Sequence, residues 1–128
     1  MNNVKVDSKK CQILVLSYDG FSDLWPIFFD YFFKYWSDCP FEINLLTNFL
    51  EYPDKRVRSL KIGKDEGWSD GVIKALNKID AERIFFFYED AFLNKPVDTD
   101  TILMFLYWAI ENNSDYIRKY ILLYKLYN

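Results

Sequence analysis

Hydrophobic and polar residues follow one another along the chain in blocks that predict strands and helices in turn. Short apolar runs, each closed by a turn signal, predict strands at 13–16, 41–48, 57–63 and 83–90. Longer segments with apolar residues at helical spacing predict helices at 24–36, 67–79 and 98–113. Because strands that alternate with helices usually pair in parallel, we expect an α/β fold with a mostly parallel sheet and helices on both faces.

Short polar side chains mark the starts of the predicted helices. Ser22 or Asp23 can cap the first helix, and Ser69 or Asp70 can cap the second. The segment 115–127 has a pattern that fits either a strand or a helix, and both assignments stay open.

The amount of aromatic surface changes this picture. The chain has 128 residues, and we expect residues 1–128 to form one domain. Aromatic residues make up 20% of it, and most of those in the first helix and in the run 102–110 are expected in the core. A domain of this size cannot bury all of its Phe, Tyr and Trp side chains. We therefore also expect a homo-oligomer or docking to a partner subunit.

Charge and residue usage exclude several classes of function. The formal net charge of −3 leaves no basic footprint, so nucleic acid is not expected as a partner. The stretch 54–64 is rich in lysine and arginine, but acidic residues lie nearby and balance the charge. We therefore interpret it as a solvated strand face. The sequence contains no histidine, which excludes mechanisms that use imidazole as a base or ligand.

Cysteine usage and hydropathy predict the compartment. Cys11 and Cys39 are too few for a disulfide framework and lack the spacing of a zinc site, so reduced thiols in a cytoplasmic protein are expected. The apolar run 102–110 is too short to cross a bilayer, so we expect no transmembrane segment and at most peripheral membrane contact.

Two adjacent acids, Glu89 and Asp90, follow the apolar run of the strand at 83–90. Carboxylates at the end of a central strand can hold Mg²⁺ or Mn²⁺, which in turn binds a diphosphate. A structural interpretation is equally open, in which Asp90 caps the turn and Glu89 points into water.

Two other polar turns are expected at the same edge, because parallel strands end on one side of a sheet. They are the segments 17–20 and 64–69. Trp68, in the second turn, could stack on a nucleotide base or sugar, or could simply cover the edge of the sheet.

Several stretches, taken in order, resemble a family of bacterial sugar transferases with the nucleotide-diphosphosugar transferase (GT-A) fold. They are "ILVLSYDGFSDLWPIFFDYFFKYWSDCPFEINLLTN", "GWSDGVIKALNKI", "IFFFYEDAFLNKPVD" and "SDYIRKY". Together they cover most residues from 13 to 120, and their order agrees with the predicted strands and helices.

The resemblance implies a Rossmann-like, donor-binding half of a GT-A enzyme that acts in surface polysaccharide biosynthesis. A divalent cation, Mn²⁺ or Mg²⁺, would be held against the diphosphate of a nucleotide-diphosphosugar. The resemblance places Glu89 and Asp90 at the cation. By the same likeness of position, the residues near the base, ribose or phosphates would be Tyr18, Asp19, Gly20, Gly67, Trp68, Ser69 and Asp70.

The chain departs from the family's pattern in two respects. The acidic motif is Tyr88-Glu89-Asp90 instead of two aspartates separated by one residue, which bears on metal dependence. The sequence ends at Asn128, where GT-A enzymes continue into an acceptor-binding half. A non-catalytic module that binds a nucleotide or a protein partner is therefore the alternative function.

Two other classes with acids at strand ends do not fit. A phosphoacceptor receiver domain needs an acid pair after the first strand, where only Asp19 stands. A haloacid-dehalogenase-like phosphatase needs two aspartates, two residues apart, at the same place.

Overall fold

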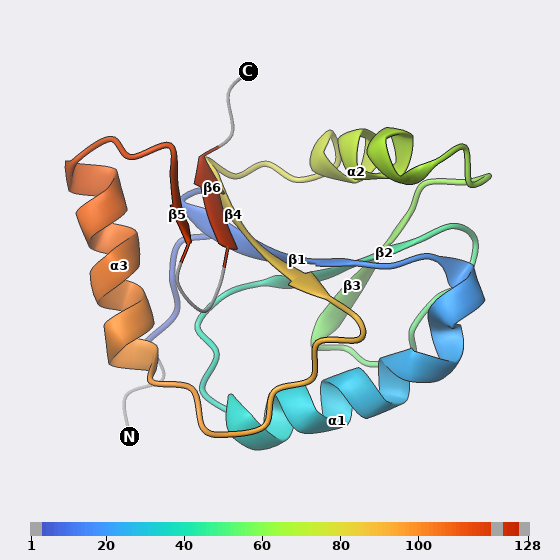
Figure 1. Cartoon of the computed structure of the whole chain (residues 1–128), viewed down its shortest axis with the longest axis horizontal. Coiled ribbons are helices and arrows are strands. Elements are labelled where there is room, and N and C mark those ends of the chain that lie inside the picture. The colour runs from blue at the N-terminus through green and yellow to red at the C-terminus, as the bar shows by residue number, and fades with distance from the viewer. Residues whose placement is uncertain (1–3, 119–121, 126–128) are drawn as a thin grey trace.

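The computed structural model describes residues 4–118 and 122–125, and its elements form one mixed six-stranded sheet with helices (Figure 1). The strands are β1 (Cys11–Leu16), β2 (Ile43–Thr47), β3 (Val57–Lys61), β4 (Arg83–Tyr88), β5 (Tyr116–Arg118) and β6 (Leu122–Lys125). The helices are a 3₁₀ segment, η1 (Asp19–Leu24), and α1 (Trp25–Tyr35), α2 (Trp68–Leu76) and α3 (Thr99–Glu111).

The strand order is β3-β2-β1-β4-β6-β5. β1 pairs in parallel with both β2 and β4, and β2 pairs in parallel with β3, whereas β6 and β5 are antiparallel additions beyond β4. The expected α/β fold with a mostly parallel sheet is thus confirmed. The chain moves outward from β1 to β3 and then returns to place β4 on the other side of β1. The point at which strand order reverses therefore lies between β1 and β4, where open α/β sheets bind ligands.

The helices cover both faces of the sheet, as expected. β1 is buried along its whole length, and its alternate residues enter two separate clusters. Ile13 and Val15 pack with α1 and α3, whereas Leu14 and Leu16 pack with α2. A central strand covered on both sides has to be apolar throughout, which explains the run of hydrophobic residues at this position.

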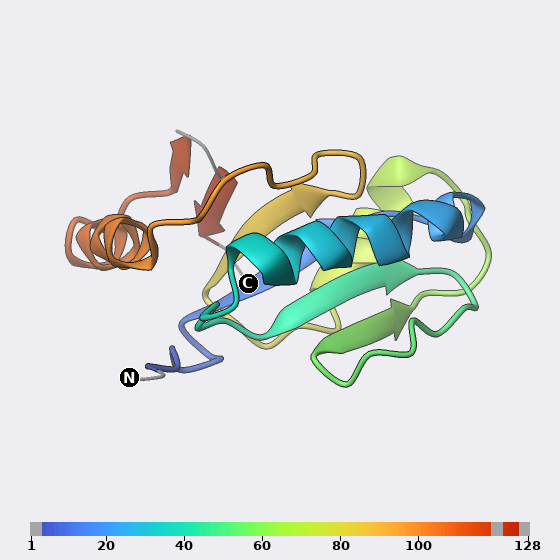
Figure 2. The ribbon, with the colours of Figure 1, turned by 90° about the horizontal axis from the view of Figure 1, so that it is seen from below.

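The aromatic residues of α1 form much of the first cluster. Phe28, Phe29, Phe32 and the C-cap residue Trp36 are buried. The Phe32 ring contacts the rings of Phe28 and Trp36 in tilted arrangements, at centroid distances of 6.0 and 5.5 Å. The indole N–H of Trp36 donates a hydrogen bond of 2.9 Å to Oγ1 of Thr99, which ties the end of α1 to the start of α3. Figure 2 shows α1 lying over one face of the sheet. The expectation that most aromatic residues form the core is correct for α1. It is wrong for the run 102–110, where Tyr107 and Trp108 are exposed and the buried residues are Leu106 and Ala109.

The helix caps differ from the expectation. The turn η1 precedes α1, the N-cap of α1 is Leu24, and neither Ser22 nor Asp23 caps it. The N-cap of α2 is Gly67, so Ser69 and Asp70 lie inside the helix instead of capping it.

The connection between β2 and β3 agrees with the predicted pattern, whereas the last segment of the chain could not be assigned from it. β2 and β3 are joined by the loop 48–56 without a helix, and Tyr52 of this loop stacks on Phe29 of α1, with ring centroids 5.0 Å apart. Of the segment 115–127, the described part contains the strands β5 and β6, while residues 119–121, 126 and 127 lie outside the described residues. Within the described part of the chain, no helix is long and apolar enough to cross a membrane.

Candidate functional site

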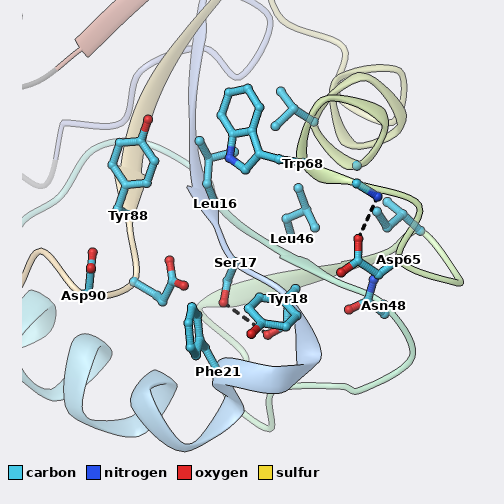
Figure 3. Close-up of a pocket in the computed structure, with 15 residues that line it drawn as sticks. Leu16, Ser17, Tyr18, Phe21, Leu46, Asn48, Asp65, Trp68, Tyr88 and Asp90 are labelled. Atoms are coloured by element: carbon cyan, nitrogen blue, oxygen red, sulfur yellow. Dashed lines mark hydrogen bonds between the residues drawn. The ribbon is translucent and has the colours of Figure 1, made fainter.

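A cleft of about 410 Å³ opens at the carboxyl ends of β1, β2 and β4, beside the start of α2 (Figure 3). Its floor is apolar and comes from four elements or their ends: Leu16, Leu46, Ile62 and Val72. The cleft therefore lies at the reversal of strand order between β1 and β4, the place where the topology of the sheet predicts a ligand.

Aromatic side chains stand around this floor. Tyr18, Phe21, Trp68 and Tyr88 all line the cleft, and all four are exposed. Trp68 is the first residue of α2, and 65% of its surface is accessible. Exposed rings that face a cleft can stack on a planar base or on the apolar face of a sugar.

The ring of Tyr18 is held in place by its own turn. It meets Phe21 edge-on at a centroid distance of 4.6 Å. A Cβ at Gly20 would overlap the Tyr18 ring, so the ring folds over a backbone position that only glycine leaves open. Tyr18 lines the cleft, and Gly20 shapes it indirectly.

The carboxylate of Asp19 is bound to protein backbone. It accepts hydrogen bonds from the backbone N–H groups of Asn48 and Phe49, both at 2.9 Å, and longer ones from Leu50. In return, Oδ1 of Asn48 accepts from the N–H of Asp19 at 2.8 Å. Asp19 therefore joins the turn after β1 to the loop after β2, and it is not among the residues that line the cleft.

Asn48 extends this connection to a third loop. Its Nδ2 donates to the carbonyl oxygen of Gly63, beyond the end of β3, at 3.0 Å. Asn48 is buried and lines the cleft. One amide side chain thus ties together the ends of three strands and fixes one wall of the site.

The acidic pair lies in the turn directly after β4, at the edge of the cleft. The turn is closed by the N–H of Ala91, which donates to the carbonyl of Tyr88. Both Glu89 and Asp90 line the cleft. Glu89 is only 7% exposed, whereas Asp90 is exposed. Burial raises the pKa of the Glu89 carboxyl; its own backbone N–H, bonded to it, opposes this effect, and the charge of Asp90 reinforces it.

The residues at the start of α2 separate into two groups. Gly67 and Trp68 line the cleft, whereas Ser69 and Asp70 do not. Asp70 instead forms an ion pair of 3.0 Å with Lys74, one turn along the helix. Gly67 has a φ of +111°, in the region that favours glycine, and this allows the chain to turn from β3 into the helix.

Besides the apolar floor, five polar or aromatic lining residues were not among the predicted site residues: Ser17, Phe21, Asn48, Asp65 and Tyr88. Asp65 belongs to a turn that was expected at this edge, and Tyr88 precedes the acidic pair, so both could have been suggested by their positions. Nothing in the local pattern marks Asn48, whose role depends on contacts with residues distant in the sequence.

The charges of the cleft are all negative. Asp65, Glu89 and Asp90 line it, and no Lys or Arg does so within the part of the chain that the structure describes. In the same described residues, no three Cys, Asp or Glu side chains come together as a ready-made metal site. Mg²⁺ is commonly bound by one or two carboxylates together with water and substrate phosphates, so the adjacent pair fits a cation that arrives with its ligand.

A second hollow, of about 440 Å³, lies beside the start of β2 and is lined by Lys5 and Arg56. The guanidinium of Arg56 lies 3.6 Å from the centroid of the Phe33 ring and forms an ion pair of 2.7 Å with Asp54. The charge of Arg56 is therefore already matched by Asp54.

Comparison with known protein families, curated proteins and solved structures finds no significant match.

Proposed function

We propose that the cleft binds a nucleotide-diphosphosugar through a divalent cation, Mn²⁺ or Mg²⁺, and that the chain serves sugar transfer in surface polysaccharide biosynthesis. The observation that carries the proposal is the meeting of two adjacent carboxylates with exposed aromatic rings in one cleft. Such a site offers a hard-cation pole and stacking faces, the two features that a nucleotide with a diphosphate requires.

The sign of the charge supports a cation. An anionic diphosphate would be repelled by Asp65, Glu89 and Asp90, since no basic side chain among the described lining residues offsets them. A divalent cation at Glu89 and Asp90 reverses this local charge. It would also relieve the cost of keeping a carboxylate at Glu89 out of water.

The two acids would have different tasks. Glu89 is buried and cannot move freely, so it would fix the position of the cation. Asp90 is exposed and would face the ligand. When bound, the cation would neutralise charge on the departing nucleoside diphosphate.

A non-catalytic binding module is the second candidate, and one observation favours it. Sugar transfer also needs a group that takes a proton from the acceptor. With Glu89 and Asp90 at the cation, Asp65 is the remaining carboxylate among the described lining residues, and it lies on the opposite side of the cleft from Asp90 (Figure 3).

The buried free thiols and the apolar surface support two further parts of the proposal. Cys11 and Cys39 are both free, which suits a reducing, cytoplasmic setting. Met104, Tyr107 and Trp108 are exposed on α3, and self-association or a partner subunit would cover them.

The test is thermal stabilisation by uridine, guanosine and thymidine diphosphosugars, each with and without Mn²⁺. We expect a cation-dependent rise in melting temperature with at least one donor, and we expect Asp90→Asn to abolish it. Glu66→Gln is the matched control, because Glu66 is an exposed acid near α2 that does not line the cleft. Release of nucleoside diphosphate from the stabilising donor separates transfer from binding alone. If no donor stabilises the protein in the presence of Mn²⁺, the proposal fails.

A further inference from the structure

The cleft has a second polar end, opposite the acidic pair. Asp65 lies in the connection between β3 and α2, and Figure 3 shows it on the side of the cleft away from Asp90, with apolar floor residues such as Leu46 between them. The site is therefore not symmetric. One end carries two adjacent carboxylates, and the other carries a single carboxylate next to the start of α2.

The geometry of Asp65 directs it as a hydrogen-bond acceptor. Its Oδ1 accepts a hydrogen bond of 3.0 Å from the backbone N–H of Gly67, which restrains the side chain. Oδ2 has no hydrogen-bond partner among the residues that the structure describes, although Asp65 lines the cleft. The exposed indole of Trp68 follows one residue after Gly67. A restrained acceptor and a stacking surface thus come from one short connection.

We propose that the ligand lies across the cleft, with its diphosphate at Glu89 and Asp90 and its nucleoside at Asp65 and Trp68. This inference rests on the proposed function and adds the orientation of the ligand and a specificity-determining residue. A lone carboxylate repels phosphate, so the phosphates belong at the cation end. The groups of a nucleotide that can donate to Asp65 are the ribose hydroxyls and the N–H groups of the base, and a planar base can stack on Trp68.

The variants for the test are chosen to keep the local turn. Asp65→Asn retains an oxygen that can accept from the Gly67 N–H, but it replaces the free acceptor with a donor. Glu66→Gln removes a neighbouring negative charge outside the cleft and is the matched control. Asp90→Asn removes a carboxylate from the cation end.

The affinity of each variant is measured in Mn²⁺ for two kinds of probe, inorganic pyrophosphate and the nucleoside diphosphate that binds most tightly in a panel of five common bases. We expect Asp65→Asn to weaken the nucleoside diphosphate about tenfold or more and to leave pyrophosphate unchanged. Unchanged pyrophosphate binding also demonstrates that the variant is folded. Asp90→Asn should weaken both probes, and Glu66→Gln neither.

Two analogues identify the donor group that Asp65 recognises. If it is a ribose hydroxyl, the 2′-deoxy nucleotide loses affinity for the wild type and is insensitive to Asp65→Asn. If it is a base N–H, a nucleotide methylated at that nitrogen binds the wild type more weakly, and its affinity does not change in Asp65→Asn.

The two proposals fail differently. Nucleoside diphosphate binding that depends on Asp90 but not on Asp65, or an equal loss of pyrophosphate binding in Asp65→Asn, overturns the orientation while the proposed function stands. If the wild type binds neither probe in Mn²⁺, both proposals are overturned.

Discussion

Replacing Asp19 by alanine tests whether this acid is part of the scaffold of the cleft. Its carboxylate holds the N–H groups of Asn48 and Phe49 at 2.9 Å and approaches that of Leu50 at 3.3 Å. Alanine removes every acceptor on this side chain. The loop after β2 then keeps the bond from the backbone N–H of residue 19 to Oδ1 of Asn48 but loses the bonds to the carboxylate, and we expect a loss of stability even without ligand.

The expected loss in the free energy of unfolding follows from the hydrogen bonds that Asp19 makes. A hydrogen bond to a charged group contributes about 1.5–3 kcal/mol. Phe49 and Leu50 are exposed, so water can replace the carboxylate at their N–H groups, whereas Asn48 is buried and its N–H cannot be hydrated as easily. One bond at nearly full value and the others at a fraction give about 2–3 kcal/mol. For a domain of this size that corresponds to a fall in melting temperature of about 8–12 °C.

The assay is urea unfolding followed by tryptophan fluorescence and far-UV circular dichroism, which should give the same transition if unfolding is two-state. Asp19→Asn keeps one oxygen acceptor and should lose about half as much. Asp23→Ala is the matched control, since Asp23 is an exposed acid in the same η1 segment. A free energy of unfolding for Asp19→Ala within about 0.5 kcal/mol of the wild type would refute the reasoning.

Two further predictions concern buried titratable groups. Because the pKa of Glu89 is raised in the folded state, stability should fall as the pH rises from the unfolded pKa, about 4.3, through the folded one. Glu89→Gln should therefore raise the melting temperature of the metal-free protein at neutral pH and have little effect near pH ~4; an unchanged pH profile in scanning fluorimetry would contradict this. Burial raises the pKa of Cys39 to about 12 and that of Cys11 higher still, so neither thiol should react with a disulfide reagent in the native protein at neutral pH, and both should react in denaturant. Rapid labelling of the native protein would show that these thiols are accessible.

The parts of the fold that the sequence predicted well are those with a strong local pattern. β1 and β4 are apolar runs because they lie at the centre of the sheet with helices on both faces, and their position could be read directly. α1 was equally clear, because its aromatic residues recur at helical spacing. The connection between β2 and β3 was expected as a turn, because Pro53 and Asp54 favour one between the two predicted strands. The antiparallel strands β5 and β6 were left open because a segment rich in Tyr, Ile and Leu suits either state.

The capping residues of the first two helices were misassigned for a physical reason. Ser22, Asp23, Ser69 and Asp70 are good capping residues by type. α1 begins after a 3₁₀ turn, so Ser22 and Asp23 come too early in the chain to cap it. α2 begins directly after a glycine with positive φ, so Ser69 and Asp70 come too late and lie inside the helix. Capping preferences describe which residue suits a helix start, whereas tertiary contacts decide where that start lies.

Asp65 lies in a turn that was expected at this edge of the sheet, but it was not itself predicted as a site residue. Acids are common in exposed turns, and Asp65 follows Lys64 and precedes Glu66 in a segment with no local signal for binding. Asp65 stabilises the turn at Gly67 by accepting a hydrogen bond from its N–H. Trp68 follows this turn as the first residue of α2, so the turn brings the indole to the cleft. The acidic pair after β4 could be recognised from the sequence, since it interrupts an apolar strand. The opposite end was recognised in part, since Gly67 and Trp68 were predicted and both line the cleft, whereas the part played by Asp65 depends on its contact with the N–H of Gly67.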